Sequence, residues 1–245
     1  MILTAHQPVY LPWLGLFHKI ALADEFVIFD QVQYLPKEWM NRNKIKTQIG
    51  SIWLTVPVLR KGHRELKTSE IQINNSVDWR KKHLRSISIN YQKTQYFEKY
   101  IPFFEKTFTQ TWDFLSDLNE HLLKWFLHEL GINMKIHKAS EFEFEGVKSD
   151  LVLDMCKKLD ASTYIFGELG KDYADECMFK NSGITPVFQN YQHPSYPQLY
   201  NKFISHLSII DLLFNCGPKS YEILMSNNMT KSDLKKDTEN KINDC

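Results

Sequence analysis

The sequence predicts an α/β fold: a mostly parallel, Rossmann-like sheet flanked by helices, with a helical insertion and a polar C-terminal tail. Three observations lead to this prediction. Short apolar segments of strand type alternate along the chain with longer segments of helical spacing. Some of the apolar segments end at an acidic residue or a glycine, as strands do where a loop begins. After about residue 226 the composition turns polar and charged, with few residues that a core could use.

The first half of the chain supplies three of the expected strands. Residues 1–5 (MILTA) and 25–29 (EFVIF) are apolar runs of strand length. Residues 14–22 (LGLFHKIAL), which lie between them, have the spacing of a short amphipathic helix. Residues 52–58 form a further strand, in which Pro57 favours an edge position or a strand end.

A largely helical part follows. Apolar positions recur at helical spacing over residues 77–91 and again over 99–130, which we expect to be one long helical stretch ending at Gly131. The second half then returns to alternation. The expected elements there are strands at 132–137, 163–166 and 185–188 and helices at 149–159, 174–181 and 206–215.

We expect residues 1–225 to form a single α/β domain, with its helical part at about 77–131, and residues 226–245 to be a disordered tail without a core role. The alternative is that the two halves form separate lobes.

Composition excludes several classes of protein. The net charge is +1, so nothing global indicates a nucleic-acid or membrane-surface partner. No apolar run approaches the length of a membrane span, and no secretion signal opens the chain. The four cysteines are far apart and form no CxxC pair, which is typical of reduced thiols in a cytosol. We therefore expect a cytoplasmic protein without membrane insertion.

The loop after the first expected strand carries the first group of candidate site residues. In HQPVYLPWLG two prolines fix the backbone, and a stiff loop lowers the cost of ordering a binding site. His6 is a candidate general base because its ordinary pKa lies near neutrality, and Gln7 both donates and accepts hydrogen bonds. Tyr10 and Trp13 offer faces for stacking. The alternative is that these two rings only pack the loop onto the sheet.

The second group is the polar stretch 38–47 (EWMNRNKIKT). Arg42 can bind a phosphate through two parallel hydrogen bonds, and Lys44 adds another cation. The amides of Asn41 and Asn43 suit the hydroxyl groups of a sugar or nucleotide. The alternative is a solvated, charged surface.

Two further positions carry polar groups on expected helices. His83 lies four residues after Trp79, so the two share a face, and His83 is a second candidate acid or base. A lone helical histidine can instead be a packed residue. Asp211 interrupts the apolar segment LSIIDLLF, and because an unpaired buried charge is costly we expect it to have a partner or a function.

The remaining candidates follow expected strands. Because the carboxyl ends of parallel strands share one edge of a sheet, Asp30 and Gly167 should lie on the same rim as the first loop. Glu168 has a glycine close by on each side, and Tyr173 follows in a loop that lacks P-loop spacing. His193 adds a polar ring of the kind that contacts carbohydrates or nucleotides. The sequence contains no motif for a metal site or a catalytic triad.

Several motifs in series resemble the WbqC-like protein family: HQPVYLPWLGLFHKIALADEFVIFDQVQY, NRNKIKT with IWLTVPV, YIFGELGKDY and HLSIIDLLFNCGP. They extend to about residue 224 and exclude the tail. The resemblance implies a role in bacterial O-antigen or other surface-polysaccharide (lipopolysaccharide) biosynthesis, and transfer of a glycyl or other aminoacyl group to an amino sugar. The residues at its motif positions are His6, Gln7, Tyr10, Pro12, Gly15, Asp30, Asn41, Arg42, Asn43, Tyr173 and Asp211.

The resemblance therefore implies a transferase that N-acylates an amino sugar, linked to a nucleotide. We expect no tightly bound cofactor, because an activated acyl or aminoacyl donor (a thioester or an adenylate) serves as co-substrate, free or on an acyl or aminoacyl carrier protein. The expected roles are pyrophosphate binding by Arg42 and Lys44, stacking by Trp13 or Tyr10, proton removal by His6 or His83, and carbonyl polarisation by Gln7 or Asn43.

Two alternatives stay open. The first is a non-catalytic protein that binds a sugar nucleotide or a carrier. The second is a nucleotidyltransferase-like enzyme, because strand, PxxxPxxG, helix and strand follow one another as in adenylyltransferase-like proteins. Trp13 and Leu14 stand where the HxGH turn of those proteins needs a histidine, which weakens this alternative. The sequence leaves the sugar, the acyl group and the oligomeric state open.

Overall fold

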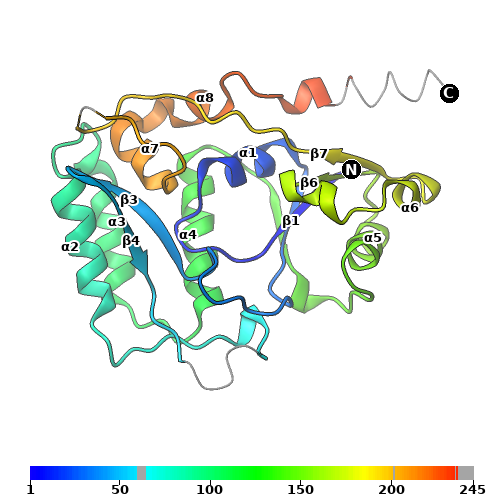
Figure 1. Cartoon of the computed structure of the whole chain (residues 1–245), viewed down its shortest axis with the longest axis horizontal. Coiled ribbons are helices and arrows are strands. Elements are labelled where there is room, and N and C mark those ends of the chain that lie inside the picture. Colours follow the sequence, from blue (N-terminus) through cyan, green and yellow to red (C-terminus); the bar gives the residue numbers. More distant parts are fainter. Residues whose placement is uncertain (60–64, 201, 235, 237–245) are drawn as a thin grey trace.

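The fold is built around one parallel sheet. The computed structural model describes residues 1–59, 65–200, 202–234 and 236 (Figure 1). The sheet has five strands in the order β5-β2-β1-β6-β7, and every neighbouring pair is parallel. This confirms the predicted fold class. The strands are β1 (Ile2–His6), β2 (Glu25–Ile28), β5 (Lys135–Lys138), β6 (Thr163–Phe166) and β7 (Thr185–Phe188).

Helices cover both faces of the sheet. Successive side chains of a strand point to opposite faces, so the strands present apolar side chains to helices on each side. Leu3 and Ala5 of β1 belong to one core with α5 and α6, whereas Phe26 and Ile28 of β2 belong to another with α1 and α4. Among the described residues no helix is both long and apolar enough to cross a membrane. The α-helices are α1 (Leu14–Leu22), α2 (Trp79–Tyr91), α3 (Phe97–Thr109), α4 (Leu115–Glu129), α5 (Ser149–Lys158), α6 (Glu176–Asn181), α7 (Ile209–Cys216) and α8 (Ser220–Met225).

A hairpin stands apart from the parallel sheet, on the side of α2 and α3 in Figure 1. It consists of β3 (Arg42–Thr47) and β4 (Gly50–Thr55), which are antiparallel. The strand expected at 52–58 pairs here through residues 52–55, and residues 42–47 of the polar stretch 38–47 form β3. The physical reason is its period of two: Lys44 and its alternate neighbours share one face, whereas Ile45 is buried on the other.

The single helical stretch expected over 99–130 is two helices, α3 and α4. The segment between them leaves the helical path because its backbone bonds to a distant segment. The N–H of Ile73 donates to the main-chain oxygen of Asp113, and the N–H of Leu115 donates to that of Ile71. The apolar spacing continues through both helices, so the sequence pattern gives no sign of the break.

The loop after β1 is held in place by other segments. The side-chain amide of Asn43 donates to the main-chain oxygen of Leu11 at 2.5 Å, and the N–H of Ile209 donates to that of Pro12 at 2.8 Å. The stiff loop expected from its prolines is therefore also tied to β3 and to the start of α7.

The segment after residue 226 contributes to packing as far as Leu234, which differs from the expected tail without a core role. Leu234 is buried with Ile2, Leu22 and Ile165. Lys231 Nζ lies 2.6 Å from the carboxylate of Asp24. The segment has few apolar residues, but one buried leucine and one ion pair dock it against the end of α1. Residues 237–245 of the expected tail lie outside the described residues.

We expect Leu234→Ala to lower the free energy of unfolding by about 2 kcal/mol, because buried leucine-to-alanine changes cost roughly 2–5 kcal/mol and this cluster is small. Urea denaturation measures the effect. The matched control is Met229→Ala in the same segment, where 41% of the side chain is already exposed. Equal effects of the two changes would show that Leu234 is not docked.

Candidate functional site

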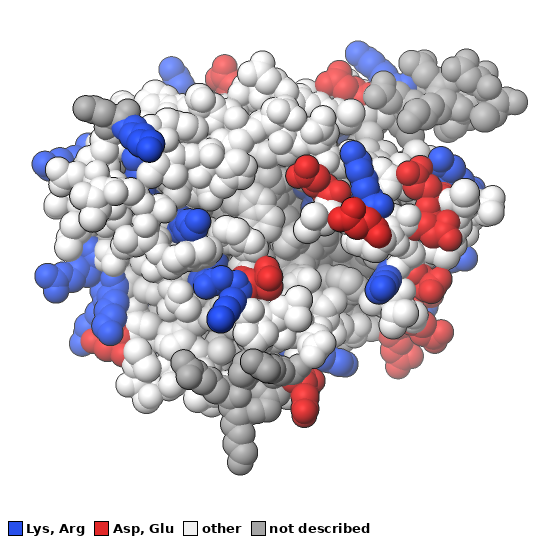
Figure 2. Space-filling view, viewed as in Figure 1, with Lys and Arg blue, Asp and Glu red and all other residues white. Residues whose placement is uncertain are grey.

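A cavity of about 650 Å³ lies at the carboxyl ends of the central strands. Its walls include His6 at the end of β1, Gly167 directly after β6 and Gln189 directly after β7. From β1 the sheet extends to β2 and β5 on one side, and to β6 and β7 on the other. The cavity therefore lies where the strand order reverses, which is where open parallel sheets bind ligands. Figure 2, which has the same view as Figure 1, shows a hollow near the middle of the molecular surface.

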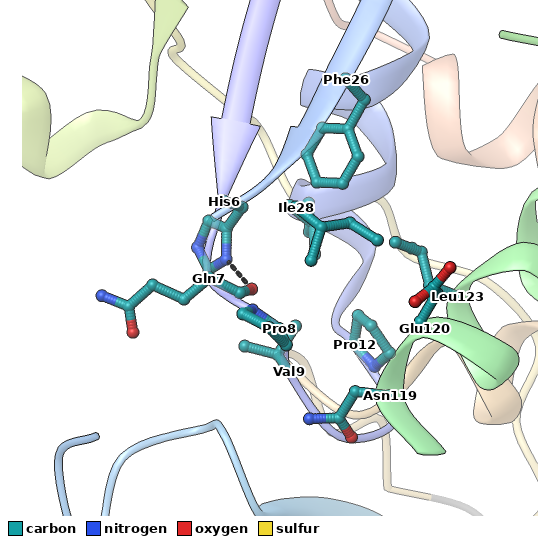
Figure 3. Close-up of a pocket in the computed structure, with 11 residues that line it drawn as sticks. His6, Gln7, Pro8, Val9, Pro12, Phe26, Ile28, Asn119, Glu120 and Leu123 are labelled. Carbon is teal, nitrogen blue, oxygen red and sulfur yellow. Dashed lines mark hydrogen bonds between the residues drawn. The ribbon is translucent and has the colours of Figure 1, made fainter. Parts of the chain in front are cut away.

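His6 lines this cavity as a neutral imidazole. Its Nδ1 lies 2.8 Å from the main-chain oxygen of Gln7, so we assign the proton to Nδ1 and the lone pair to Nε2 (Figure 3). Burial and the nearby charge of Lys19 lower the pKa of His6 to about 3, and the hydrogen bond to Gln7 opposes this shift only in part. The side chain of Gln7 also lines the cavity, and in Figure 3 it extends away from the other residues drawn.

Lys19 is a buried lysine on the wall of the same cavity, and the sequence-based candidates omit it. Only 5% of its surface is exposed, and its Nζ donates to the main-chain oxygen of Ala5 at 2.9 Å. Burial lowers the pKa of Lys19 to about 8, and no described carboxylate pairs with it. Such perturbed groups cluster at functional sites. The available signal was its position beside His18 in LGLFHKIAL, where the two interrupt an otherwise apolar helix.

A neighbouring part of the wall joins three segments. Gln189 donates from Nε2 to the main-chain oxygen of Gly15 and to Nδ1 of His18, both at 2.8 Å. Nε2 of His18 lies 3.0 Å from the main-chain oxygen of Met229, so this histidine links α1 to the C-terminal segment. The hydroxyl of Tyr191 is buried, and no described residue forms a hydrogen bond with it. A Cβ at Gly15 would lie 3.1 Å from the Tyr191 ring, so a larger residue there would require the ring to move by a few tenths of an ångström.

Three other predicted binding residues line the cavity: Trp13, Tyr173 and His193. The ring of Trp13 stands edge-on to that of His6, with centroids 5.4 Å apart. Nε2 of His193 accepts a hydrogen bond from the N–H of His206, which lines the same cavity and which sequence reasoning also missed. The structure thus brings these residues together at one site.

Tyr10 and His83 are not on the cavity wall. The Tyr10 hydroxyl lies 2.7 Å from Nδ1 of His83, and both side chains are buried. Burial lowers the pKa of His83 to about 4, against the effect of a hydrogen bond to the backbone of Thr55. This pair joins the loop after β1 to α2, and the structure does not bring His83 to His6.

Asp30, Asn41 and Asn43 also lie outside the cavity wall. The carboxylate of Asp30 accepts hydrogen bonds from the N–H and the hydroxyl of Ser140, at 2.9 and 2.7 Å. The amide of Asn41 donates to the main-chain oxygen of Val56, and Asn43 holds the loop after β1 as described above. Their buried polar groups are therefore used within the fold.

Arg42 and Lys44 lie on the hairpin. The guanidinium carbon of Arg42 is 4.3 Å from the centroid of the Trp53 ring, and Lys44 Nζ is 4.9 Å from it. The guanidinium also donates to the main-chain oxygen of Lys37. No described carboxylate forms an ion pair with either cation.

Asp211 has the partners that the sequence requires of a buried acid. Its carboxylate accepts hydrogen bonds from the hydroxyls of Tyr91 and Tyr196 and from Gln198, at 2.9, 3.0 and 2.7 Å. Lys46, which donates to Gln198 at 2.8 Å, supplies a nearby positive charge. Asp211 thus holds together β3, α2 and the extended segment that leads to α7.

Two other features bound the interpretation. Within the described ranges, no group of three or more His, Cys, Asp and Glu side chains could hold a metal ion. The small cavity drawn in Figure 3 has a volume of about 10 Å³ and lies between the loop after β1 and α4. It is too small for a substrate.

Comparison with known proteins identifies the family. The model of the WbqC-like protein family matches residues 7–223. The chain belongs to the WbqC-like protein family. An uncharacterized protein of Mycobacterium tuberculosis is 34% identical over 220 residues, which make up 89% of this chain and 95% of that protein. No solved structure matches. The WbqC-like match covers the loops after β1 and β6, which line the cavity, and ends before the docked C-terminal segment.

Proposed function

We propose that this WbqC-like protein is a transferase that N-acylates an amino sugar carried on a nucleotide, in the biosynthesis of a bacterial surface polysaccharide. The observation that carries the proposal is one pair of side chains. A buried lysine with a pKa of about 8 and a neutral histidine, which responds to the charge of that lysine, line the same cavity at the switch point of the sheet.

Transfer of an acyl group to an amine needs a group that removes the proton from the ammonium form. Lys19 suits this task because a pKa near the working pH lets one group accept a proton and return it. His6, with a pKa of about 3, is a weaker base than we expected from the sequence. In the proposal its Nε2 accepts a hydrogen bond from the amine and orients the nitrogen lone pair. Gln7 donates to the carbonyl oxygen, where negative charge develops.

The proposed step is a direct transfer. Neutral Lys19 takes a proton from the sugar ammonium, and the amine nitrogen attacks the carbonyl carbon of the donor. A C–N bond forms, and the C–S bond of a thioester or the C–O bond of an adenylate breaks, with the electron pair leaving on sulfur or oxygen. The nitrogen loses its second proton to solvent. Protonated Lys19 returns its proton to a leaving thiolate, or to solvent when the leaving group is the phosphate of an adenylate.

The rest of the cavity fits such a pair of substrates. Its lining includes Phe29, Leu151 and Phe166, which suit an acyl group. It also includes polar side chains, among them Lys19, Glu168 and the histidines. A covalent acyl-enzyme has no support, because none of the described cysteines lines the cavity and burial raises the pKa of Cys156 to about 12.

We expect thermal unfolding to respond to an amino-sugar nucleotide more than to the matching nucleotide sugar without the amine. His6→Ala should abolish turnover, measured as product mass, while it leaves this thermal shift in place. His128→Ala, an exposed change on α4, is the control. Binding without turnover in the unmodified protein would favour the non-catalytic alternative. A shift with nucleoside triphosphates alone, and release of pyrophosphate, would favour nucleotidyl transfer.

A further inference from the structure

Three tryptophans form a continuous track from the cavity to the open surface. Trp13 lines the cavity, and its ring centroid lies 5.8 Å from that of Trp39. Trp39 in turn lies 5.3 Å from Trp53 of β4, which is 42% exposed. The exposed part of Trp53 is an apolar surface at the outer end of this track, and indole rings stack well on sugars and bases.

The outer end of the track carries two cations that form no ion pair with any residue the structure describes. Lys44 stands directly opposite Trp53 across the hairpin, and Arg42 lies two residues along on the same face. Both lie over the Trp53 ring at the distances given above, which holds them in position before any ligand arrives.

The third cation of this row behaves differently. Lys46 is only 2% exposed, and its Nζ donates to Gln198 and to the main-chain oxygens of Tyr200 and Lys202. Its hydrogen bonds are used within the fold. Arg42 and Lys44 instead keep N–H groups that can donate hydrogen bonds to a phosphate. A guanidinium binds phosphate through two parallel hydrogen bonds.

We propose that this face of the hairpin is the subsite for the nucleoside diphosphate end of the substrate. The diphosphate binds Arg42 and Lys44, the base packs against the exposed part of Trp53, and the sugar reaches past Trp39 and Trp13 to the cavity. The cavity volume of about 650 Å³ lies in the range that holds one small ligand, so the sugar and the acyl group fill it and the nucleotide lies outside. This inference rests on the proposed function in naming a sugar nucleotide.

The test is isothermal titration calorimetry of the full chain with uridine diphosphate and thymidine diphosphate, which lack the sugar. We expect binding of at least one of them. Arg42→Gln and Lys44→Gln should each weaken it about tenfold or more, since a charge-assisted hydrogen bond is worth about 1.5–3 kcal/mol. Trp53→Leu should weaken it similarly, and Trp53→Phe less. Each of these positions is at least partly exposed, so the variants keep the fold.

Two control variants make the result specific. Lys81→Gln removes a cation on α2 whose side chain is 86% exposed, and it should leave diphosphate affinity unchanged. His6→Ala should also leave that affinity unchanged, because His6 acts at the sugar end. Equal weakening by Lys81→Gln, or unchanged affinity in Arg42→Gln and Lys44→Gln, would overturn the subsite.

Failure of the inference and failure of the proposed function give different results. Acylation of an amino-sugar nucleotide that is unaffected by Arg42→Gln and Lys44→Gln would overturn the subsite and leave the transferase standing. Diphosphate binding that depends on both cations, without acylation of any amino-sugar nucleotide, would support the subsite and contradict the transferase. Binding of coenzyme A at these residues in place of either diphosphate would assign the track to the acyl donor and overturn the inference.

Discussion

Lys19→Met should abolish acyl transfer without lowering the stability of the fold. Removal of a general acid or base costs roughly 10²–10⁴ in rate, so we expect at least a hundredfold loss of turnover. Burial lowers the pKa of Lys19 from 10.5 to about 8, which means that its charge costs the folded state about 3 kcal/mol near neutral pH. Methionine removes that cost but leaves the main-chain oxygen of Ala5 without its donor. We therefore expect the free energy of unfolding to stay unchanged or to rise by up to about 2 kcal/mol.

The sign of the pH dependence follows from the lowered pKa. The folded protein binds fewer protons than the unfolded chain between about pH 8 and 10.5, so the cost is fully present below pH 8 and fades as the pH rises through that window. The free energy of unfolding of Lys19→Met should therefore exceed that of the parent protein by the largest amount below pH 8. Lys157→Met, an exposed change on α5, is the control for both readouts. A loss of more than about 1 kcal/mol with full activity would make Lys19 a structural residue.

Asp211→Ala should be among the most destabilising single changes in the chain. It removes the acceptor of the Tyr91, Tyr196 and Gln198 donors in a buried site, and breaking a buried charged network typically costs 3–5 kcal/mol. Urea denaturation measures this loss. Because the extended segment that holds Tyr196 also carries His193 of the cavity wall, binding of the substrate should weaken as well.

The same residue gives a prediction for pH. Burial raises the pKa of Asp211 to about 6, although its three hydrogen bonds and Lys46 oppose the shift. The folded protein therefore binds a proton more readily than the unfolded chain, and between about pH 4 and 6 this residue makes the free energy of unfolding fall as the pH rises. Asp211→Asn should remove about 3 kcal/mol of that fall relative to the parent protein.

The control for Asp211 is Asp113→Asn, an exposed position between α3 and α4 that should change stability by less than about 0.5 kcal/mol at any pH. If the free energies of unfolding of Asp211→Asn and the parent protein differed by a constant amount from pH 4 to 7, the Asp211 carboxyl would not have a raised pKa.

The sequence was sufficient for the parallel sheet and several of its helices because their patterns are local. Residues 14–22, 163–166 and 185–188 form the predicted elements with the predicted bounds. The rim placement of His6 and Gly167 followed from one rule on parallel strands, and both line the cavity. Asp30 also follows a strand, but its carboxylate turns to Ser140, which no local pattern encodes.

The missed features depend on contacts between distant segments. Lys19 is marked only weakly in its own helix, and its lowered pKa arises from burial by the surrounding fold. The roles of Tyr10 and His83 changed for the same reason, because a hydrogen bond over 73 positions joins them inside the core. The Trp13, Trp39 and Trp53 track joins a loop, a turn and a strand, so its continuity exists only in three dimensions.

The mass of the product shows whether this cavity joins an acyl group to an amino sugar. The full chain is incubated with an amino-sugar nucleotide and a ¹³C-labelled glycyl or acyl thioester or adenylate, and the nucleotide fraction is analysed by mass spectrometry. We expect the parent protein to form a product that carries the labelled acyl group on nitrogen, and Lys19→Met to form none. A product formed equally by Lys19→Met, or no labelled product with any amino-sugar nucleotide that binds, would contradict the proposed acyl transfer.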